Sequence, residues 1–240
     1  TTLSSVYAQG TWGGVSVATP DNLNAISSNP AGLGLSRGNQ SGMYISFNFD
    51  EEFAMHSANR MDGFGYSLQY NFTNGEFPDA FNPADGTIGV GTSLFPNAYV
   101  GLKWNKHHLI DLGLLYRPFN QVSIAYVTQV YDDEFTEINS ATYGLAIRPF
   151  LQHRLTLGAD VIYSYNGFDY FDGPESSAVY PHMTLVPVDG ISISARSNAD
   201  FDNINFNLSF NFGKQSVYSP GSYTELNKEY NGGIGFYTNS

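Results

Sequence analysis

Three arginines are the residues whose type and spacing best suggest chemistry. Arg117, Arg148 and Arg154 each lie beside a tight, proline-containing connection between strand-like stretches. The alternation of the neighbouring residues places all three on the same inward face, near the same set of turns. Guanidinium groups gathered at the mouth of a pore can hold a neighbouring segment or select anionic solutes, as charged rings do in channels.

The same alternation places Asp111 and Asp160 on the inward face. The alternative role of the arginines is therefore to form ion pairs with these two carboxylates, or with Asp21 near the N-terminus. A charge costs little when water or a partner is present, whereas a charge facing lipid is expensive. The face of the strands on which these charges lie is thus a testable expectation.

Other reactive side chains give weaker indications. His107 and His108 are adjacent, and neighbouring residues of a strand point to opposite faces, which is poor geometry for chelating a metal. Acidic clusters at 50–52, 132–134 and 169–175 offer oxygen ligands that calcium favours, but they lack the spacing of a calcium loop. We therefore expect a turn and solvated loops at these positions, and no metal site.

Catalytic motifs are absent from the sequence. It contains no Gly-x-Ser-x-Gly elbow, no His-Glu-x-x-His pair and no phosphate-binding loop. We predict that the chain is not an enzyme and uses no cofactor.

The composition excludes further classes. The 240 residues include 10 Lys and Arg against 22 Asp and Glu, a formal net charge of −12, and 13% are charged. A nucleic-acid partner is not expected, because neutralising phosphates needs a cationic surface. With no cysteine, disulfide scaffolds, thiolate zinc sites and thiol nucleophiles are impossible. A hydrophobic share of 42% is enough to form a core, which argues against disorder.

No stretch of about 20 consecutive apolar residues is present, so no helical membrane span is expected. The chain begins at Thr1 without the basic and apolar regions of a signal peptide. We expect it to be a processed or trimmed product.

Alternation with a period of two dominates the sequence. In residues 204–212, large apolar side chains alternate with Asn and Ser, and the same pattern recurs along most of the chain. The pattern predicts twelve strands, at 41–49, 52–59, 63–72, 87–95, 98–105, 108–117, 121–131, 140–148, 153–165, 177–186, 190–197 and 203–213.

Three features favour a membrane barrel over a soluble β-sandwich, which also alternates. The polar faces carry mostly small neutral residues, the apolar faces often end in aromatics, and strands of 8–13 residues suit a tilted bilayer crossing. An open sheet would leave edge amides without partners in lipid, so the strands must close. We predict an all-β, antiparallel, transmembrane β-barrel of a bacterial outer membrane, with about twelve strands and fourteen as the alternative.

The connections alternate in character. Bacterial barrels have short periplasmic turns and longer external loops, which assigns the tight connections and the segment before residue 41 to the periplasmic side. The tight connections lie at 95–97, 117–120, 148–152 and 186–190, and the longer acidic ones at 73–86, 132–139, 166–176 and 197–203.

Residues 8–35 carry a Gly-rich start, a short Val-Ala run, an Asp/Asn-rich stretch and then Asn29, Pro30, Ala31, Gly32 and Leu33. This stretch resembles the opening of FadL/PorV-like outer-membrane barrels. The resemblance implies that the N-terminal segment is tucked into the barrel as a hatch. The chain is shorter than those proteins, and its inward faces are more polar than a fatty-acid tunnel would need.

The expected organisation has three parts. Residues 1–40 form the periplasmic or hatch segment, 41–213 the barrel, and 214–240 a periplasmic tail, an extra strand or a linker. Strand 203–213 resembles the aromatic-ended assembly signal of outer-membrane barrels, which usually ends the chain.

Two functions from different classes fit this architecture. The first is a transport protein or channel for small or hydrophobic solutes. The second is a non-conducting, PorV-like anchor or scaffold for a periplasmic or secretion-system protein, or the barrel module of a larger periplasmic enzyme. In either case outer-membrane lipid and lipopolysaccharide are the expected surroundings.

Overall fold

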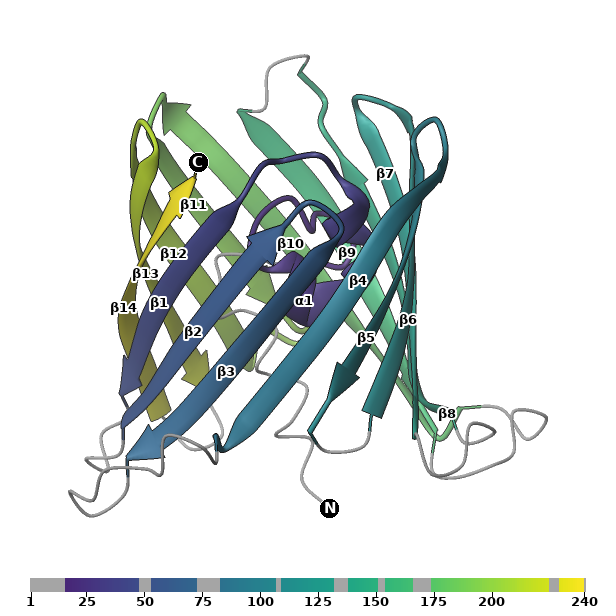
Figure 1. Cartoon of the computed structure of the whole chain (residues 1–240), viewed down its shortest axis with the longest axis horizontal. Coiled ribbons are helices and arrows are strands. Elements are labelled where there is room, and N and C mark those ends of the chain that lie inside the picture. Colours follow the sequence, from purple (N-terminus) through teal and green to yellow (C-terminus); the bar gives the residue numbers. More distant parts are fainter. Residues whose placement is uncertain are drawn as a thin grey trace.

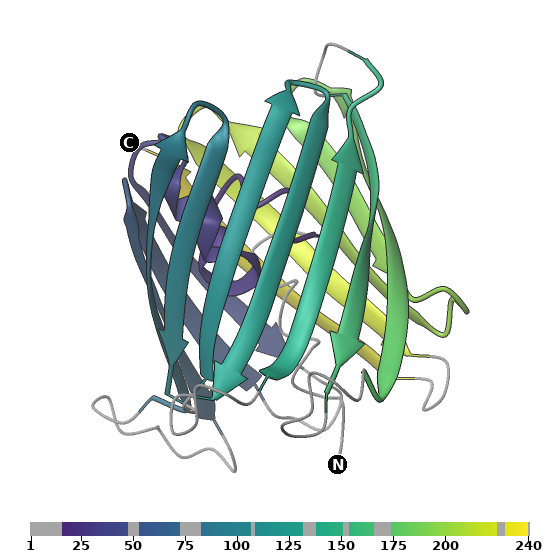
Figure 2. The ribbon, with the colours of Figure 1, turned by 90° about the vertical axis from the view of Figure 1, so that its right-hand side faces the viewer.

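The computed structural model describes residues 16–47, 53–72, 83–106, 109–131, 138–150, 154–165, 174–224 and 229–239. These residues form fourteen strands that close into one barrel, as Figures 1 and 2 show. Every strand pairs antiparallel with the next in sequence, and the last pairs with the first, with Gln40 opposite Asn239. The strands are β1 (Gln40–Phe47), β2 (Phe53–Met61), β3 (Phe64–Phe72), β4 (Asp85–Phe95), β5 (Ala98–Asn105), β6 (Leu109–Phe119), β7 (Val122–Tyr131), β8 (Ile138–Ile147), β9 (Leu155–Ser164), β10 (Ser176–Val188), β11 (Ile191–Ser197), β12 (Asn203–Phe212), β13 (Gln215–Thr224) and β14 (Glu229–Asn239).

The barrel has fourteen strands, the alternative count, rather than the twelve expected first. Each of the twelve expected strands has its counterpart in β1–β12. Of the three roles expected for residues 214–240, the extra strand is nearest to the structure, in which two strands, β13 and β14, complete the barrel wall. The barrel therefore runs from residue 40 to 239 rather than from 41 to 213. The physical reason is closure: without these two strands, β1 and β12 would each have an unpaired edge.

The barrel wall is inverted relative to a soluble protein, as the sequence predicts. In β6, Leu112 and Leu114 are 43% and 47% exposed on the outside, whereas Asp111 is 3% exposed on the inside. Exposed large apolar side chains recur on most of the other strands, and these outward side chains form a surface that suits lipid acyl chains rather than water.

The tight connections gather at one end of the barrel. Two-residue turns at 62–63, 96–97, 120–121, 189–190 and 213–214 join successive strands there, and this end is the upper one in Figure 1. We call it the tight-turn end.

Residues 16–39, here named the inner segment, run inside the barrel and lead into β1 (Figures 1 and 2). They contain a single turn of helix, α1 (Ala25–Ser28), and a 3₁₀ helix, η2 (Pro30–Gly34). No helix of the described chain is long and apolar enough to cross a membrane. The inner segment supplies most of the fully buried apolar side chains, because the barrel interior offers few of its own.

Candidate functional site

The inner segment lies on a row of glycines in the barrel wall. Gly91 of β4 is directly opposite Gly101 of β5, which is directly opposite Gly113 of β6. A Cβ atom on any of the three would collide with Asn29 or Pro30. The row therefore forms a shallow groove that lets the backbone of the inner segment approach the backbone of the wall.

Asn29 organises the part of the inner segment that rests in this groove. Its side-chain oxygen accepts a hydrogen bond from the backbone N–H of Ala31 at 3.0 Å, which caps η2, and Pro30 occupies the first helical position. Its side-chain amide donates to the carbonyls of Val17 at 3.0 Å and of Leu114 in β6 at 3.2 Å. The Asn-Pro motif thus joins two parts of the inner segment to the wall.

Two wall cations bind backbone carbonyls of the inner segment. Arg60 of β2 is fully buried and donates to Gly32 at 2.8 Å, to Leu35 at 2.7 Å and to Asn22 at 3.1 Å. Lys103 of β5 donates to the carbonyl of Ser27 at 2.8 Å. Hydrogen bonds from charged donors are stronger than neutral ones, so these contacts contribute much of the polar attachment.

Asp21 of the inner segment joins three arginines at the tight-turn end. Arg117 lies 2.7 Å, Arg148 3.1 Å and Arg37 3.2 Å from its carboxylate oxygens. Burial of the Asp21 carboxyl by itself would raise its pKa, but the three guanidinium charges and the hydrogen bond from Arg117 outweigh this and hold the pKa below its usual value. Asp21 is therefore ionised at neutral pH.

The structure sorts the expected lumen charges into separate groups. Arg117 and Arg148 come together, whereas Arg154 is exposed in the turn before β9, outside their cluster. Arg154 precedes the first residue of β9, Leu155, so it lies outside the alternation of the strand, and Arg37 of the inner segment takes the third place.

Asp111 and Asp160 pair with cations other than these arginines. Asp111 binds Lys103 at 2.6 Å. Asp160, fully buried, lies 3.5 Å from Arg196 and accepts a 2.6 Å hydrogen bond from Ser16 of the inner segment. Both carboxylates point inward, as the alternation predicts, and Asp160 is a further anchor for the inner segment.

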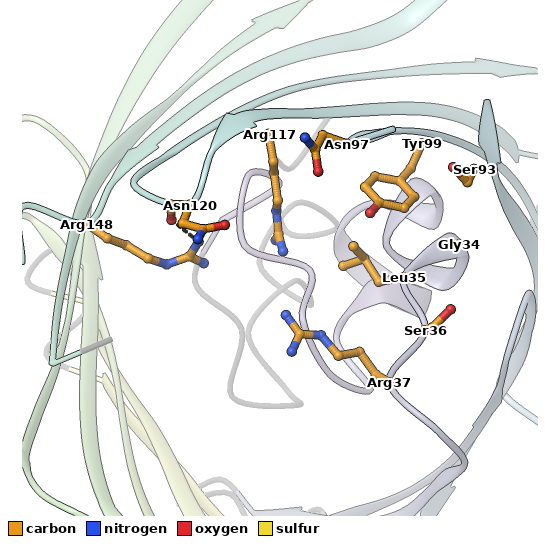
Figure 3. Close-up of a pocket in the computed structure, with 10 residues that line it drawn as sticks. All are labelled: Gly34, Leu35, Ser36, Arg37, Ser93, Asn97, Tyr99, Arg117, Asn120 and Arg148. Carbon is orange, nitrogen blue, oxygen red and sulfur yellow. Dashed lines mark hydrogen bonds between the residues drawn. The ribbon is translucent and has the colours of Figure 1, made fainter. Parts of the chain in front are cut away.

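A pocket of about 520 Å³ opens beside the Asp21 cluster, and we name it the arginine pocket. Figure 3 shows the guanidinium groups of Arg37, Arg117 and Arg148 pointing toward its centre from three directions. The wall side comes from the turns and strand ends of β4 to β8, and the other side from the end of the inner segment. Its lining residues are Gly34, Leu35, Ser36, Arg37, Ser93, Asn97, Tyr99, Arg117, Asn120 and Arg148.

Sequence reasoning missed Arg37, Arg60, Lys103 and Arg196. The last three occupy inward positions of alternating strands, and that signal was available for each of them. Arg37 lies in the inner segment, outside any periodic pattern, so only the fold reveals its place.

Metal binding finds no support among the described residues, which contain no cluster of three or more His, Asp or Glu side chains able to hold an ion. His107 and His108 lie outside the described residues. The same holds for the acidic clusters at 50–52 and 132–134 and for residues 169–173 of the third cluster.

No known sequence family and no curated protein matches the chain. Solved structures do match in fold. The Acinetobacter baumannii outer membrane protein Omp33 has a TM-score of 0.53 and 10% identity, over 86% of this chain and 100% of that one. A deltaS2S3 mutant of TodX, a monoaromatic hydrocarbon channel, has a TM-score of 0.58 and 12% identity, over 90% and 94% of the two chains.

A third similar structure, CymD, is also a monoaromatic hydrocarbon channel, with a TM-score of 0.56 and 9% identity over 97% of this chain and 96% of that one. These likenesses concern the fold. Together with the outward apolar surface and the inward charges, they give the chain the architecture of a multi-pass β-barrel of the outer membrane.

Proposed function

We propose that the protein is an outer-membrane channel for small solutes and that residues 16–39 act as its hatch. The observation that carries this proposal is the way in which the inner segment is held. Charged and polar wall side chains, among them Arg60, Lys103 and Asp160, bind it across the lumen. Such groups can exchange their partners for water when the segment moves, whereas a purely apolar filling would lose its whole driving force.

Two further observations support the channel. TodX and CymD, which share the fold, are described as monoaromatic hydrocarbon channels. The resemblance of residues 8–35 to FadL/PorV-like barrels supports the hatch. Since bacterial barrels have their short turns on the periplasmic side, the tight-turn end, with the Asp21 cluster, would face the periplasm.

Planar-bilayer conductance tests the proposal. We expect the intact chain to show few or no openings, and a chain lacking residues 1–30 to show discrete current steps, because the deletion removes Asp21 and the Asn29–Pro30 contacts. Since that deletion also removes buried side chains, the point variant Arg60→Met provides a milder release of the same segment.

The control is Arg154→Gln, which changes an exposed arginine at the same end of the barrel. It should behave like the parent chain. Silence in the deletion and in Arg60→Met, from barrels that remain folded, would contradict a channel and favour a non-conducting anchor.

A further inference from the structure

The arginine pocket has the features of a binding site for a small anion. Three guanidinium groups, those of Arg37, Arg117 and Arg148, face it, and none of its lining residues is acidic. Among the described residues, the carboxylate of Asp21 is the acidic group bound to these arginines. The pocket thus keeps an excess of positive charge in a chain whose formal net charge is −12.

The arginines have hydrogen-bonding capacity to spare. Arg117 uses Nη1 for Asp21 and Nε for Ser123, at 3.3 Å, and its second terminal nitrogen is buried without a partner among the described residues. The side chains of Arg117 and Arg148 are only 13% and 10% exposed. A buried donor without an acceptor is costly, and an anionic oxygen in the pocket would remove that cost.

The volume and the hydrogen-bond donors of the pocket limit the kind of ligand that it can bind. A volume of about 520 Å³ lies within the range of small-molecule sites. Arginine forks match the paired oxygens of carboxylates and phosphates, which a spherical ion such as chloride cannot provide. Neutral donors beside the arginines, the amide of Asn97 and the hydroxyl of Tyr99, also line the pocket.

The geometry points to the arginine pocket as a binding site for a small water-soluble oxyanion, a solute bearing a carboxylate or phosphate group, at the tight-turn end of the lumen. This inference rests on the proposed channel for its biological meaning, since it names the class of solute that the channel favours. The binding itself is independent of conduction.

Isothermal titration of the detergent-solubilised full chain with inorganic phosphate, with succinate and with chloride tests the inference. We expect saturable binding of phosphate or succinate, no saturable binding of chloride, and at least a tenfold loss of affinity in Arg37→Gln. Arg37 is the suitable target because its side chain is 48% exposed, so the substitution leaves the barrel intact. Arg37→Lys keeps the charge but loses the fork, and we expect an intermediate affinity.

The matched control is again Arg154→Gln, which removes an equal charge outside the pocket and should bind like the parent. Absence of saturable oxyanion binding by the parent, or equal affinities of the parent and Arg37→Gln, would overturn the inference. So would an equal loss in Arg154→Gln, which would mean that only general charge matters.

Comparing bilayer conductance with phosphate binding separates this inference from the proposed function. Channels that conduct without binding phosphate would leave the function standing and remove the oxyanion site. Phosphate binding by a chain that conducts in no variant would do the reverse.

Discussion

Replacing Arg60 with Met should release the inner segment from the wall. Arg60 is fully buried and donates three hydrogen bonds to the inner segment, of which those to the carbonyls of Gly32 and Leu35 are the two shortest and carry most of the attachment. A hydrogen bond to a charged group contributes about 1.5–3 kcal/mol, so the loss of two weakens docking by about 3–6 kcal/mol. Methionine fills much of the volume and removes the burial cost of the guanidinium charge, which places the effect toward the lower end.

This loss has a measurable consequence. Each 1.4 kcal/mol is a factor of ten, so the ratio of docked to released inner segment should fall by about two to four orders of magnitude. Ser28 reports the change because it is only 2% exposed in the docked segment, and the chain has no cysteine of its own. A Ser28→Cys probe therefore reacts with a maleimide only when the segment leaves the wall.

The assay compares maleimide labelling rates of Ser28→Cys in three backgrounds: the parent chain, Arg60→Met and Arg154→Gln. When docking and release are fast, the rate follows the released fraction. We expect Arg60→Met to raise the rate at least a hundredfold and Arg154→Gln to leave it unchanged. Equal rates in the parent and in Arg60→Met, with both barrels folded, would refute the idea that wall cations hold the segment.

Three other predictions follow from the contacts of the inner segment and the closure of the barrel. Gly101→Val should raise the labelling rate of the same probe about tenfold or more, because its side chain would collide with the Pro30 carbonyl, whereas Gly86→Ala, which meets only an ordinary contact, should not. Asp21 has a lowered pKa, so its contribution is complete above its ordinary value of 3.8 and is lost as the pH falls through the lower folded value. The labelling rate, divided at each pH by the rate of the same probe in the unfolded chain to cancel the titration of the thiol, should thus be constant from pH 7 to about 4 and rise below that, and Asp21→Asn should reduce this rise. Removal of residues 214–240 should prevent formation of a heat-resistant barrel on gels, since β13 and β14 close the wall; a stable twelve-stranded product would contradict this.

Much of the wall was predictable from the sequence because alternation in a membrane barrel is a local signal. The strands with large outward side chains, such as β6 and β12, were recognised nearly to the residue. Two wall carboxylates were also assigned to the correct side, since Asp111 of β6 and Asp160 of β9 are buried inside the barrel, whereas Arg154 was not.

The last two strands were expected only as one extra strand among three alternatives for residues 214–240, because their residues imitate loops. β13 contains Pro220 and Gly221, and β14 contains Gly233 and Gly235. In the barrel these glycines make room for aromatic rings of neighbouring strands: a Cβ atom would meet the ring of Phe206 at Gly221, that of Tyr44 at Gly233 and that of Tyr218 at Gly235. A glycine that receives a cross-strand ring looks in a single sequence like a turn.

The sequence offered Asp21 as an alternative partner of Arg117 and Arg148, and the structure has these pairs. The partners of the other charges were beyond its reach for a different reason. Alternation gives the face of a residue but not its neighbours around the barrel, so Arg196 could not be matched with Asp160, nor Arg37 with Asp21. Those pairings depend on strand register and on the path of the inner segment, which is not periodic.

Shape and charge act together in holding the inner segment, and their dependence is itself testable. The glycine row lets the Pro30 backbone lie against the wall, and in that position the carbonyl of Gly32 lies 2.8 Å from the guanidinium of Arg60. The hydrogen bonds of Arg60 therefore require the close approach at Gly101. If so, once Gly101→Val has lifted the segment, Arg60→Met has little left to remove, and the double variant should release the segment less than the two single effects combined. Pairing Gly101→Val with Arg148→Gln gives the comparison, because Arg148 of the wall holds the segment through Asp21 rather than through η2. Additive effects in both pairs would mean that the groove and the cations hold the segment independently.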